Sequence, residues 1–187
     1  MIKYTKEKVV VNDNYIAQYN SWKIILPVVQ NVSIYDGPEK YLTDLSKFSK
    51  EQKYVFAISL YQSEVNNGGH DQFFFNSTGI VYQDMLDGLN KLSEGDYYNI
   101  AKEAGARMEA PLSQDIEIRR KYLLSAKPNF DDLDTKFYDL DKTKPLEKIL
   151  KDYILNNKEK FYFEGIIEVS DFDPDKFMND FLNKQKQ

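Results

Sequence analysis

The sequence predicts an all-α fold, a single compact domain of roughly eight to ten helices joined by short loops. Apolar residues recur along most of the chain at the i, i+3, i+4 and i+7 spacing of a helix face. Strand signals are thin by comparison, and neither a repeat nor a low-complexity linker divides the 187 residues. We therefore expect one domain over residues 1–187.

The first long element is expected after Ser49, because Ser49 and Gln52 have the spacing of a capping box. From Val55 to Tyr61 the segment is apolar nearly all round, which is typical of a buried central helix. Upstream, Val9–Val11 is a short strand signal. Asp36-Gly37-Pro38 marks a break or a helix start.

Four apolar stripes predict the helices that follow, and Pro145 suits the first turn of the last of them. The stripes are Val81, Met85, Leu89 and Leu92; Tyr97, Ala101, Ala104 and Met108; Leu133, Phe137 and Leu140; and Leu146, Ile149, Leu150, Tyr153 and Ile154. Phe161-Tyr162-Phe163 fits either a strand or a helix. A final helix is expected around Phe177 and Phe181, starting near Asp173-Pro174.

Composition narrows the class of protein. The chain has no cysteine and one histidine, so thiolate zinc sites, disulfides and histidine metal clusters are excluded, and we expect no metal or other cofactor. It shows neither a leader-like start nor a membrane-length apolar run. We therefore expect a cytoplasmic protein without membrane contact.

The charge is acidic and uneven. The net charge is −5; 16 acidic and 15 basic residues precede Asn129, whereas 14 acidic and 10 basic residues lie from Asn129 onward. Binding to phosphates needs the opposite sign, so direct nucleic-acid binding is disfavoured. The acidic C-terminal third is compatible with a protein partner that has a basic surface, although a simply solvated acidic face is the simpler interpretation.

The segment Glu64–Gly79 (EVNNGGHDQFFFNSTG) concentrates amides, carboxyls, paired glycines and three phenylalanines. It predicts a helix end, a turn in which a glycine adopts the left-handed conformation, a short helix and a second turn. The candidate motif residues, structural or ligand-binding, are Glu64, Asn67, Gly68, Gly69, His70, Gln72 and Asn76. Mutual hydrogen bonds within the turn explain them structurally; a ligand site or an active site is the alternative.

The spacing E-x-x-N-G-G-x-x-Q-F-x-x-N-x-x-G over residues 64–79 resembles the signature of the DNA-mimic protein family, once catalogued as a domain of unknown function. F-D-D-L-D-x-x-F-Y at Phe130–Tyr138, and the helix through Tyr153 followed by Asn157 and Phe161, are similar to that family's C-terminal half. The resemblance spans about residues 49–163, and it implies a family-like core over these residues with helical extensions at the N-terminal and C-terminal ends of the domain.

The resemblance implies an all-helical, non-enzymatic protein whose acidic surface imitates duplex phosphates and occupies the DNA-binding face of a regulator such as a transcription factor. This chain departs from that pattern, because bases nearly balance acids over its first two thirds. An enzyme or ligand-binding protein built around the double-glycine turn remains an alternative, as does a scaffold that forms a homodimer through exposed Tyr and Phe.

If part of the chain binds a basic partner, the acidic residues beyond Asn129 are the candidates. They are Asp131, Asp132, Asp134, Glu164, Glu168, Asp171, Asp173 and Asp175, with Asp139 and Asp141 in support. Placement at a helix N-terminus explains the first three equally well. Arg119-Arg120-Lys121 predicts a surface patch or an ion-pair partner for the acidic end, and His70 a turn or cap role.

Overall fold

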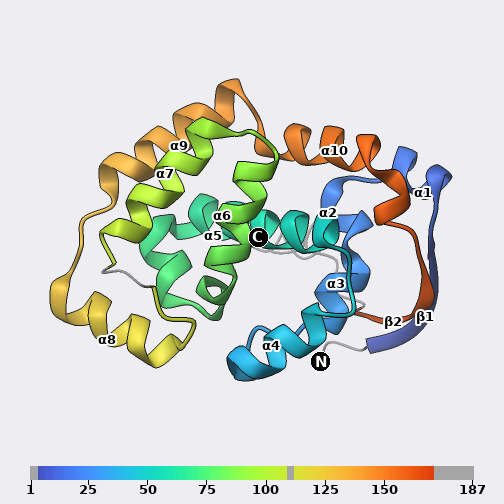
Figure 1. The fold of residues 1–187 in the computed structure, drawn as a ribbon, viewed down its shortest axis with the longest axis horizontal. Coiled ribbons are helices and arrows are strands. Elements are labelled where there is room, and N and C mark those ends of the chain that lie inside the picture. Colours follow the sequence, from blue (N-terminus) through green and yellow to red (C-terminus); the bar gives the residue numbers. More distant parts are fainter. Residues whose placement is uncertain (1–3, 109–111, 171–187) are drawn as a thin grey trace, which may run out of the picture.

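The computed structural model describes residues 4–108 and 112–170. Within these residues the chain forms ten α-helices, two short 3-10 helices and two strands (Figure 1). The elements are β1 (Tyr4–Val11), α1 (Asp13–Gln18), α2 (Ser21–Ile24), α3 (Leu26–Asn31), α4 (Gly37–Leu45), α5 (Lys50–Phe75), η1 (Ser77–Val81), α6 (Tyr82–Lys91), α7 (Gly95–Ala106), α8 (Ile116–Ala126), α9 (Asp131–Thr143), α10 (Leu146–Asn156), η2 (Lys158–Lys160) and β2 (Phe163–Ser170). The predicted all-α class is confirmed.

Helix α5 is the centre of the molecule. It contacts α6, η1, α8 and α9, and α2, α3 and α10 also pack against it. Figure 1 shows α7 beside α9 at one end of the molecule, with the two-stranded sheet beyond α3 at the other. The start of α5 has the predicted capping box: Ser49 Oγ accepts from the Gln52 N–H at 3.1 Å, and Gln52 Oε1 accepts from the Ser49 N–H at 3.0 Å.

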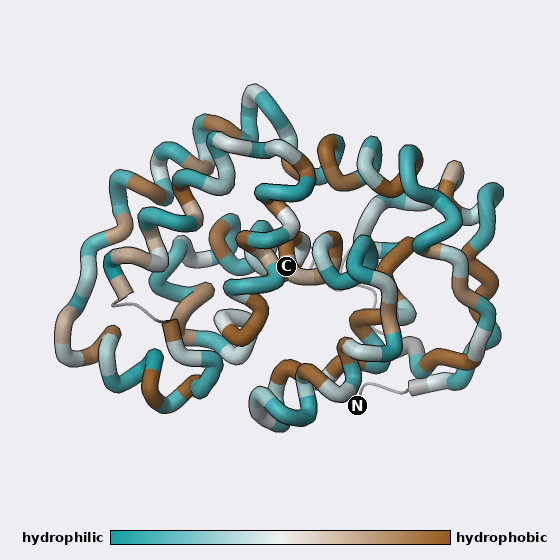
Figure 2. Tube along the Cα trace, viewed as in Figure 1, coloured by the Kyte–Doolittle hydropathy of each residue, from teal (hydrophilic) through white to brown (hydrophobic). Residues whose placement is uncertain are grey.

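The apolar stripes face this centre as the periodicity predicts. Met85 and Leu89 of α6, Tyr97 and Ala101 of α7, and Leu150 of α10 are fully buried. Figure 2 shows hydrophobic and hydrophilic residues alternating along α7, α9 and α10 at about every turn. Burying a large apolar side chain stabilises a fold by roughly 1.5–3 kcal/mol, so these stripes supply much of the driving force for packing.

Two strands join the ends of the described chain. β1 pairs with β2 in antiparallel register, with Val11 opposite Phe163 and Lys6 opposite Glu168. Val11 and Ile167 are buried against the helices, while Ile166 is 68% exposed. The short strand signal at Val9–Val11 is therefore the end of a longer strand. The sequence of Phe161-Tyr162-Phe163 fitted either a strand or a helix. In the structure Phe161 caps the end of η2, and Phe163 is the first residue of β2.

No helix among the described residues is long and apolar enough to cross a membrane. The helix expected around Phe177 and Phe181, and the start expected at Asp173-Pro174, lie outside the described residues.

Candidate functional site

The double-glycine turn, Gly68-Gly69, kinks α5 rather than ending it. Gly68 has φ −157° and ψ 26°, and Gly69 has φ 74° and ψ −175°, so neither is helical although the helix resumes at once. The conformation of Gly69 is open almost only to glycine. A Cβ on Gly69 would overlap the Asp134 carboxylate, and one on Gly68 would overlap the Gln72 side chain. The predicted turn is present, and its tight packing requires both glycines.

Glu64 lies just before the kink and binds three donors that come after it. Its Oε2 accepts from Gln72 Nε2 at 2.6 Å and from Asn76 Nδ2 at 3.0 Å. Its Oε1 accepts from Thr78 Oγ at 3.0 Å. We call these four residues the Glu64 cluster. Hydrogen bonds to a charged group contribute about 1.5–3 kcal/mol each, so the cluster ties both arms of kinked α5 to η1.

His70 is fully buried directly after the kink. Its Nδ1 lies 2.5 Å from Asp134 Oδ1, and its Nε2 lies 2.7 Å from the Tyr61 hydroxyl. The His70 backbone N–H donates to the same Asp134 oxygen at 2.9 Å. Because a carboxylate only accepts, Nδ1 carries the proton and Nε2 accepts from Tyr61. His70 thus joins α5 to α9, a larger role than the predicted turn or cap.

Three aromatic rings enclose the imidazole. The rings of Tyr61, Phe130 and Phe137 lie 5.6, 6.0 and 6.3 Å from it, measured between centroids. Burial, with the charge of Asp134 adding to it, raises the pKa of Tyr61 well above its ordinary value. The hydroxyl of Tyr61 therefore keeps its proton at physiological pH.

Arg119 of α8 is 1% exposed, so the predicted surface patch is wrong for this residue. It donates to four backbone carbonyls: Nε to Phe74 at 3.0 Å, Nη2 to Asn76 at 3.0 Å, and Nη1 to Ser113 and Gln114 at 3.0 and 2.8 Å. The carbonyls at the end of α5 lack helical partners, and Arg119 supplies donors to them. Burial lowers the pKa of Arg119 to about 10. This value is still well above 7, so Arg119 remains charged at neutral pH.

Gly79 makes room for this guanidinium. A Cβ at Gly79 would lie 2.7 Å from Arg119 Nε and 2.9 Å from the Phe73 carbonyl oxygen. The last glycine of the 64–79 segment therefore allows α8 to cap α5. Arg120, half-buried beside it, donates to the Phe75 carbonyl at 3.0 Å and lies 4.7 Å from the Phe75 ring centroid.

Chemically, the segment has its polar groups turned inward. Glu64, Gln72, Asn76 and His70 each bind another side chain, and Asn67 alone of the candidate side chains is exposed. Surface pockets open between α4 and α8 and between α7 and η1, and neither is lined by Glu64, His70 or Gln72. The hydrogen bonds of these groups hold kinked α5 against η1, α8 and α9.

The acidic start of α9 lies partly in this interior. Asp131, Asp132 and Asp134 occupy the first turn, where carboxylates suit the free N–H groups. Asp134 binds His70, and Asp132 pairs with Arg107 at 2.5 Å and with Lys136 at 3.4 Å. The Arg107 contact holds the pKa of Asp132 well below its usual range. Asp131 is exposed, and its carboxylate has no ion pair within the described chain.

Further along α9, Asp139 pairs with Lys142 at 2.9 Å. Asp141 accepts from the Tyr97 hydroxyl at 2.9 Å and the Leu146 N–H at 2.8 Å, so it organises the connection to α10. Asp139 is therefore exposed but paired, whereas Asp141 is half-buried and bonded to another helix.

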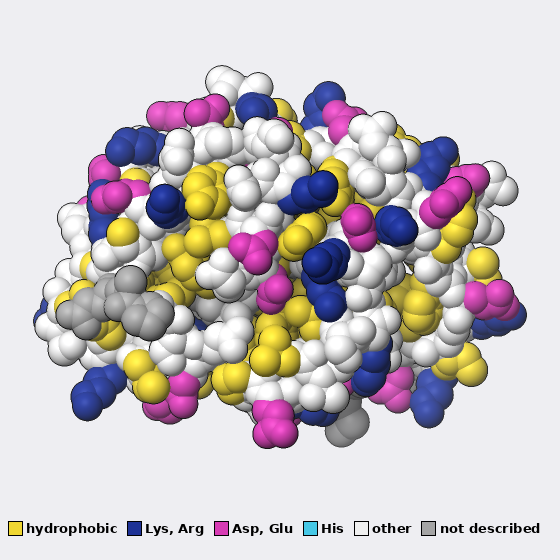
Figure 3. Space-filling view, in the orientation of Figure 1, with side chains coloured by type: hydrophobic (Ala, Val, Ile, Leu, Met, Phe, Trp, Pro, Cys, Tyr) yellow, Lys and Arg dark blue, Asp and Glu magenta, His cyan; other side chains and the backbone are white. Residues whose placement is uncertain are grey.

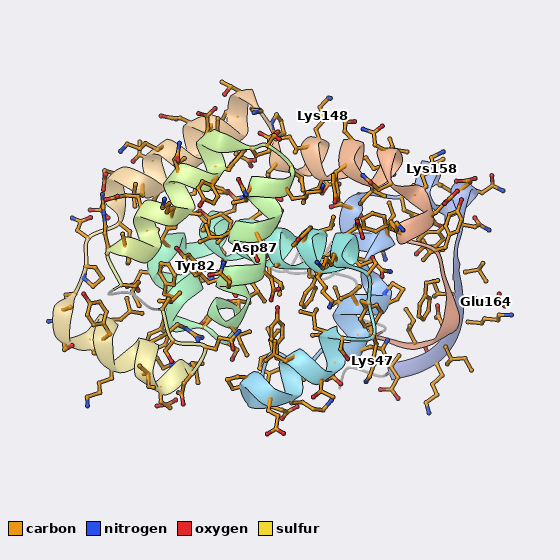
Figure 4. All side chains as sticks on the ribbon, viewed as in Figure 1. Lys47, Tyr82, Asp87, Lys148, Lys158 and Glu164 are labelled. Atoms are coloured by element: carbon orange, nitrogen blue, oxygen red, sulfur yellow. The ribbon has the colours of Figure 1, made fainter. Side chains whose placement is uncertain are left out.

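The candidate acids of β2 sit on the sheet. Glu164, at the rim of the molecule in Figure 4, pairs with Lys8 at 2.7 Å, which lowers the pKa of Glu164. Glu168 is exposed; it stands opposite Lys6 in the register and makes no ion pair with a described residue. Asp171, Asp173 and Asp175 lie outside the described residues. On the face shown in Figure 3, acidic and basic side chains are interspersed rather than gathered by sign.

Sequence patterns could not identify Arg119, Tyr61 and Asp134 as partners of the central segment. Two of the contacts join residues far apart in the chain: 64 positions separate His70 from Asp134, and 45 separate Phe74 from Arg119. Tyr61 lies only nine positions before His70, but the kink at Gly68-Gly69 between them sets their approach. One available signal is the lone histidine next to paired glycines. A buried imidazole needs a partner at each ring nitrogen, which directs the search to the carboxylates and tyrosines of other helices.

A family model described as DMP19-like protein matches residues 46–157 of this chain. The match covers α5 through α10 and includes the kinked helix with its partners on α8 and α9. No curated protein matches, and no solved structure matches.

Proposed function

The chain belongs to the DMP19-like protein family, and from this premise we propose that it is a non-enzymatic interaction module for a DNA-binding protein. The family is one of DNA mimics, which suggests a DNA-binding protein as partner. In this proposal exposed carboxylates meet a basic surface of the partner, the face that a regulator uses for DNA.

The observation that carries the proposal is the internal use of the 64–79 segment. Glu64 accepts hydrogen bonds from three side chains, and the two ring nitrogens of His70 contact Asp134 and Tyr61. Arg119 donates to four backbone carbonyls. Arg119 lines the pocket between α4 and α8, but its donors are directed at backbone carbonyls, and Glu64 and His70 line neither of the pockets named above. A reaction centre would place such an acid or base in a pocket. Since these groups stabilise the fold instead, the surface is the part of the molecule left to carry function.

Among the candidate acids, Asp131 and Glu168 are the most available to a partner, because both are exposed and unpaired within the described residues. Glu164 and Asp132 are already paired with bases and would have to exchange partners. The exposed pair of Glu164 with Lys8 contributes only about 0–1 kcal/mol, so its exchange costs little. The bidentate pair of Asp132 with Arg107 is stronger, so Asp132 is less available. The proposal thus needs a few freely placed carboxylates and not a continuous acidic array.

The test is retention of DNA-binding proteins on the immobilised chain. The proteins that bind duplex DNA in an extract of the source cells are applied at low salt and then eluted with duplex DNA. We expect a retained protein that duplex DNA displaces. The variant D131K/E168K should lose it, whereas the control D96K/E159K, with the same charge change at two other exposed acids, should keep it. Retention that is indifferent to duplex DNA and to both variants contradicts the proposal.

A further inference from the structure

A pocket opens between α7 and η1, next to the chain that leads into α8. Its volume is about 320 Å³, which falls in the range of about 300–1,000 Å³ that is usual for pockets that take a whole small ligand. We call it the α7–η1 pocket. It is separate from the Glu64 cluster, because none of the four residues of that cluster lines it.

The inner wall of the pocket is apolar. Ile80 of η1 is 3% exposed, and Leu112 is half-buried. Tyr82 reaches from α6 to α7, where its hydroxyl donates to the Ala101 carbonyl at 3.3 Å (Figure 4). This approach requires Gly105, because a Cβ there would overlap the Tyr82 hydroxyl. The wall therefore offers aliphatic and aromatic surface to the apolar part of a ligand.

Lys102 of α7 is the one charged side chain among the described residues that line the pocket. It is exposed and forms no ion pair with a described residue. Its Nζ lies 5.7 Å from the centroid of the Tyr98 ring, a contact that contributes little at an exposed site. The described lining thus has a positive charge, and an anionic group of a ligand complements it.

The acidic residues next to the lining have other partners. Asp87 accepts from Gln83 Nε2 at 2.8 Å, and Glu103 accepts from Arg107 Nε at 3.4 Å. Neither acid lines the pocket. Lys102 is therefore the ionic group that a ligand meets at the opening.

Two polar side chains lie beside Lys102 in the lining. Gln114 is half-buried, and its amide makes no hydrogen bond with a described residue. Ser113 Oγ accepts from the Asp115 N–H at 3.1 Å, which leaves the hydroxyl proton of Ser113 free to be donated. Arg119 holds the backbone of both residues, because its Nη1 donates to their carbonyls at 3.0 and 2.8 Å. Two donors are thus positioned next to the apolar wall.

We propose that the α7–η1 pocket binds a small carboxylic acid with an apolar body. The apolar body packs against Ile80 and Leu112, and the carboxylate pairs with Lys102 and accepts from Gln114 or Ser113. An apolar amine would meet the charge of Lys102 with a like charge, and an apolar alcohol would leave that charge unpaired. This inference goes beyond the proposed function, which depends on carboxylates at other places on the surface.

The test titrates the full chain with octanoate, octanol and octylamine, which share one chain length, and follows the backbone amide signals by NMR. We expect octanoate to shift the signals of Gly79 and Gly105, which line the pocket. Octanol should bind about three- to five-fold more weakly, as the loss of an exposed ion pair predicts, and octylamine more weakly still.

Two variants separate the charge from the cavity. K102Q should lower the affinity for octanoate to that for octanol and leave octanol binding unchanged. A106F, which places a ring in the pocket from an exposed position, should weaken the binding of both by about ten-fold or more. K121Q and A126F make the same changes at exposed positions of α8 outside the pocket and should bind as the wild type does. Thermal melting should show that all four variants are folded.

The inference is overturned if octanoate does not bind, if octanol or octylamine binds as tightly as octanoate, or if either pocket variant leaves octanoate affinity unchanged. The variant D131K/E168K should lose the DNA-binding protein and still bind octanoate as the wild type does. The two proposals can therefore fail separately.

Discussion

The imidazole of His70 lies 2.5 Å from the carboxylate of Asp134, although 64 positions separate the two residues. This pair locks the kink of α5 to α9, and Asp134 also fills the space that a side chain on Gly69 would need. Histidine, carboxylate and glycine form one structural unit, which explains why a segment with catalytic residue types has a structural role here.

His70→Ala should lower the free energy of unfolding by about 2–4 kcal/mol, because it leaves a cavity and unpairs both Tyr61 and Asp134. Asp134→Ala should have a similar effect, and the double variant should cost less than the sum of the two. Urea unfolding measures all three. The control is Asp131→Ala on the same helix turn, which should change stability by less than about 0.5 kcal/mol. Additive effects of the two substitutions would contradict the pairing.

Glu64→Gln keeps the size of the side chain but replaces one acceptor oxygen with an NH₂ group. That group would face the donors of Gln72, Asn76 or Thr78. We expect a loss of about 1–3 kcal/mol in the free energy of unfolding. Asp71→Asn, at an exposed site within the same segment, should be close to neutral. Equal stability of both variants would show that the Glu64 cluster contributes little.

Gly69→Ala and Gly79→Ala should each destabilise the protein by more than about 2 kcal/mol. The first forces a side chain into positive φ against Asp134, and the second pushes Arg119 away from the end of α5. Gly95→Ala, where an added Cβ meets nothing within 4 Å, is the matched control and should be neutral or slightly stabilising. Thermal melting compares the three, and a well-tolerated Gly79→Ala would argue against the Arg119 cap.

Asp44 gives the protein a defined response to acid. Its buried carboxylate binds Lys40, Lys47 at 3.0 Å and the Ser33 N–H at 3.3 Å, and the lysine contacts lower the pKa of Asp44 to about 2. An acid with a depressed pKa in the folded state stabilises the protein above its unfolded pKa, near 3.8. This stabilisation is lost as the pH falls from about 4 towards 2. Asp44→Asn should therefore lower stability at pH 7 and behave like the wild type near pH 2, as urea unfolding across this pH range can establish.

The local parts of the fold follow from the sequence. The capping box at Ser49, the stripe through Met85 and Leu89, and the need for glycine at Gly69 each depend on neighbours within a few residues, and each is present. The parts that could not be predicted depend on contacts across the chain. β1 pairs with β2 more than 150 positions away, as Tyr4 opposite Ser170 shows. The sequence alone predicts Arg119 as a surface charge, because its burial depends on the end of α5, which packs beside it only in the folded protein.

The candidate site likewise has a part that the sequence indicates and a part that only the structure shows. Hydrogen bonds within the Glu64 cluster connect residues at most 14 positions apart, so the motif itself indicates them. The exposure of the acids depends on how the helices pack. Asp131 is free whereas Asp134, three residues on, faces the interior, and only the three-dimensional structure separates them.

The measurement that tests the central claim most directly is the salt dependence of affinity between this protein and the DNA-binding protein that it retains. If exposed carboxylates carry the interaction, affinity should fall by about ten-fold or more between 50 and 200 mM salt, and duplex DNA should compete for the same partner. An affinity that stays constant over this range, or a complex that forms equally well with duplex DNA bound, would contradict it.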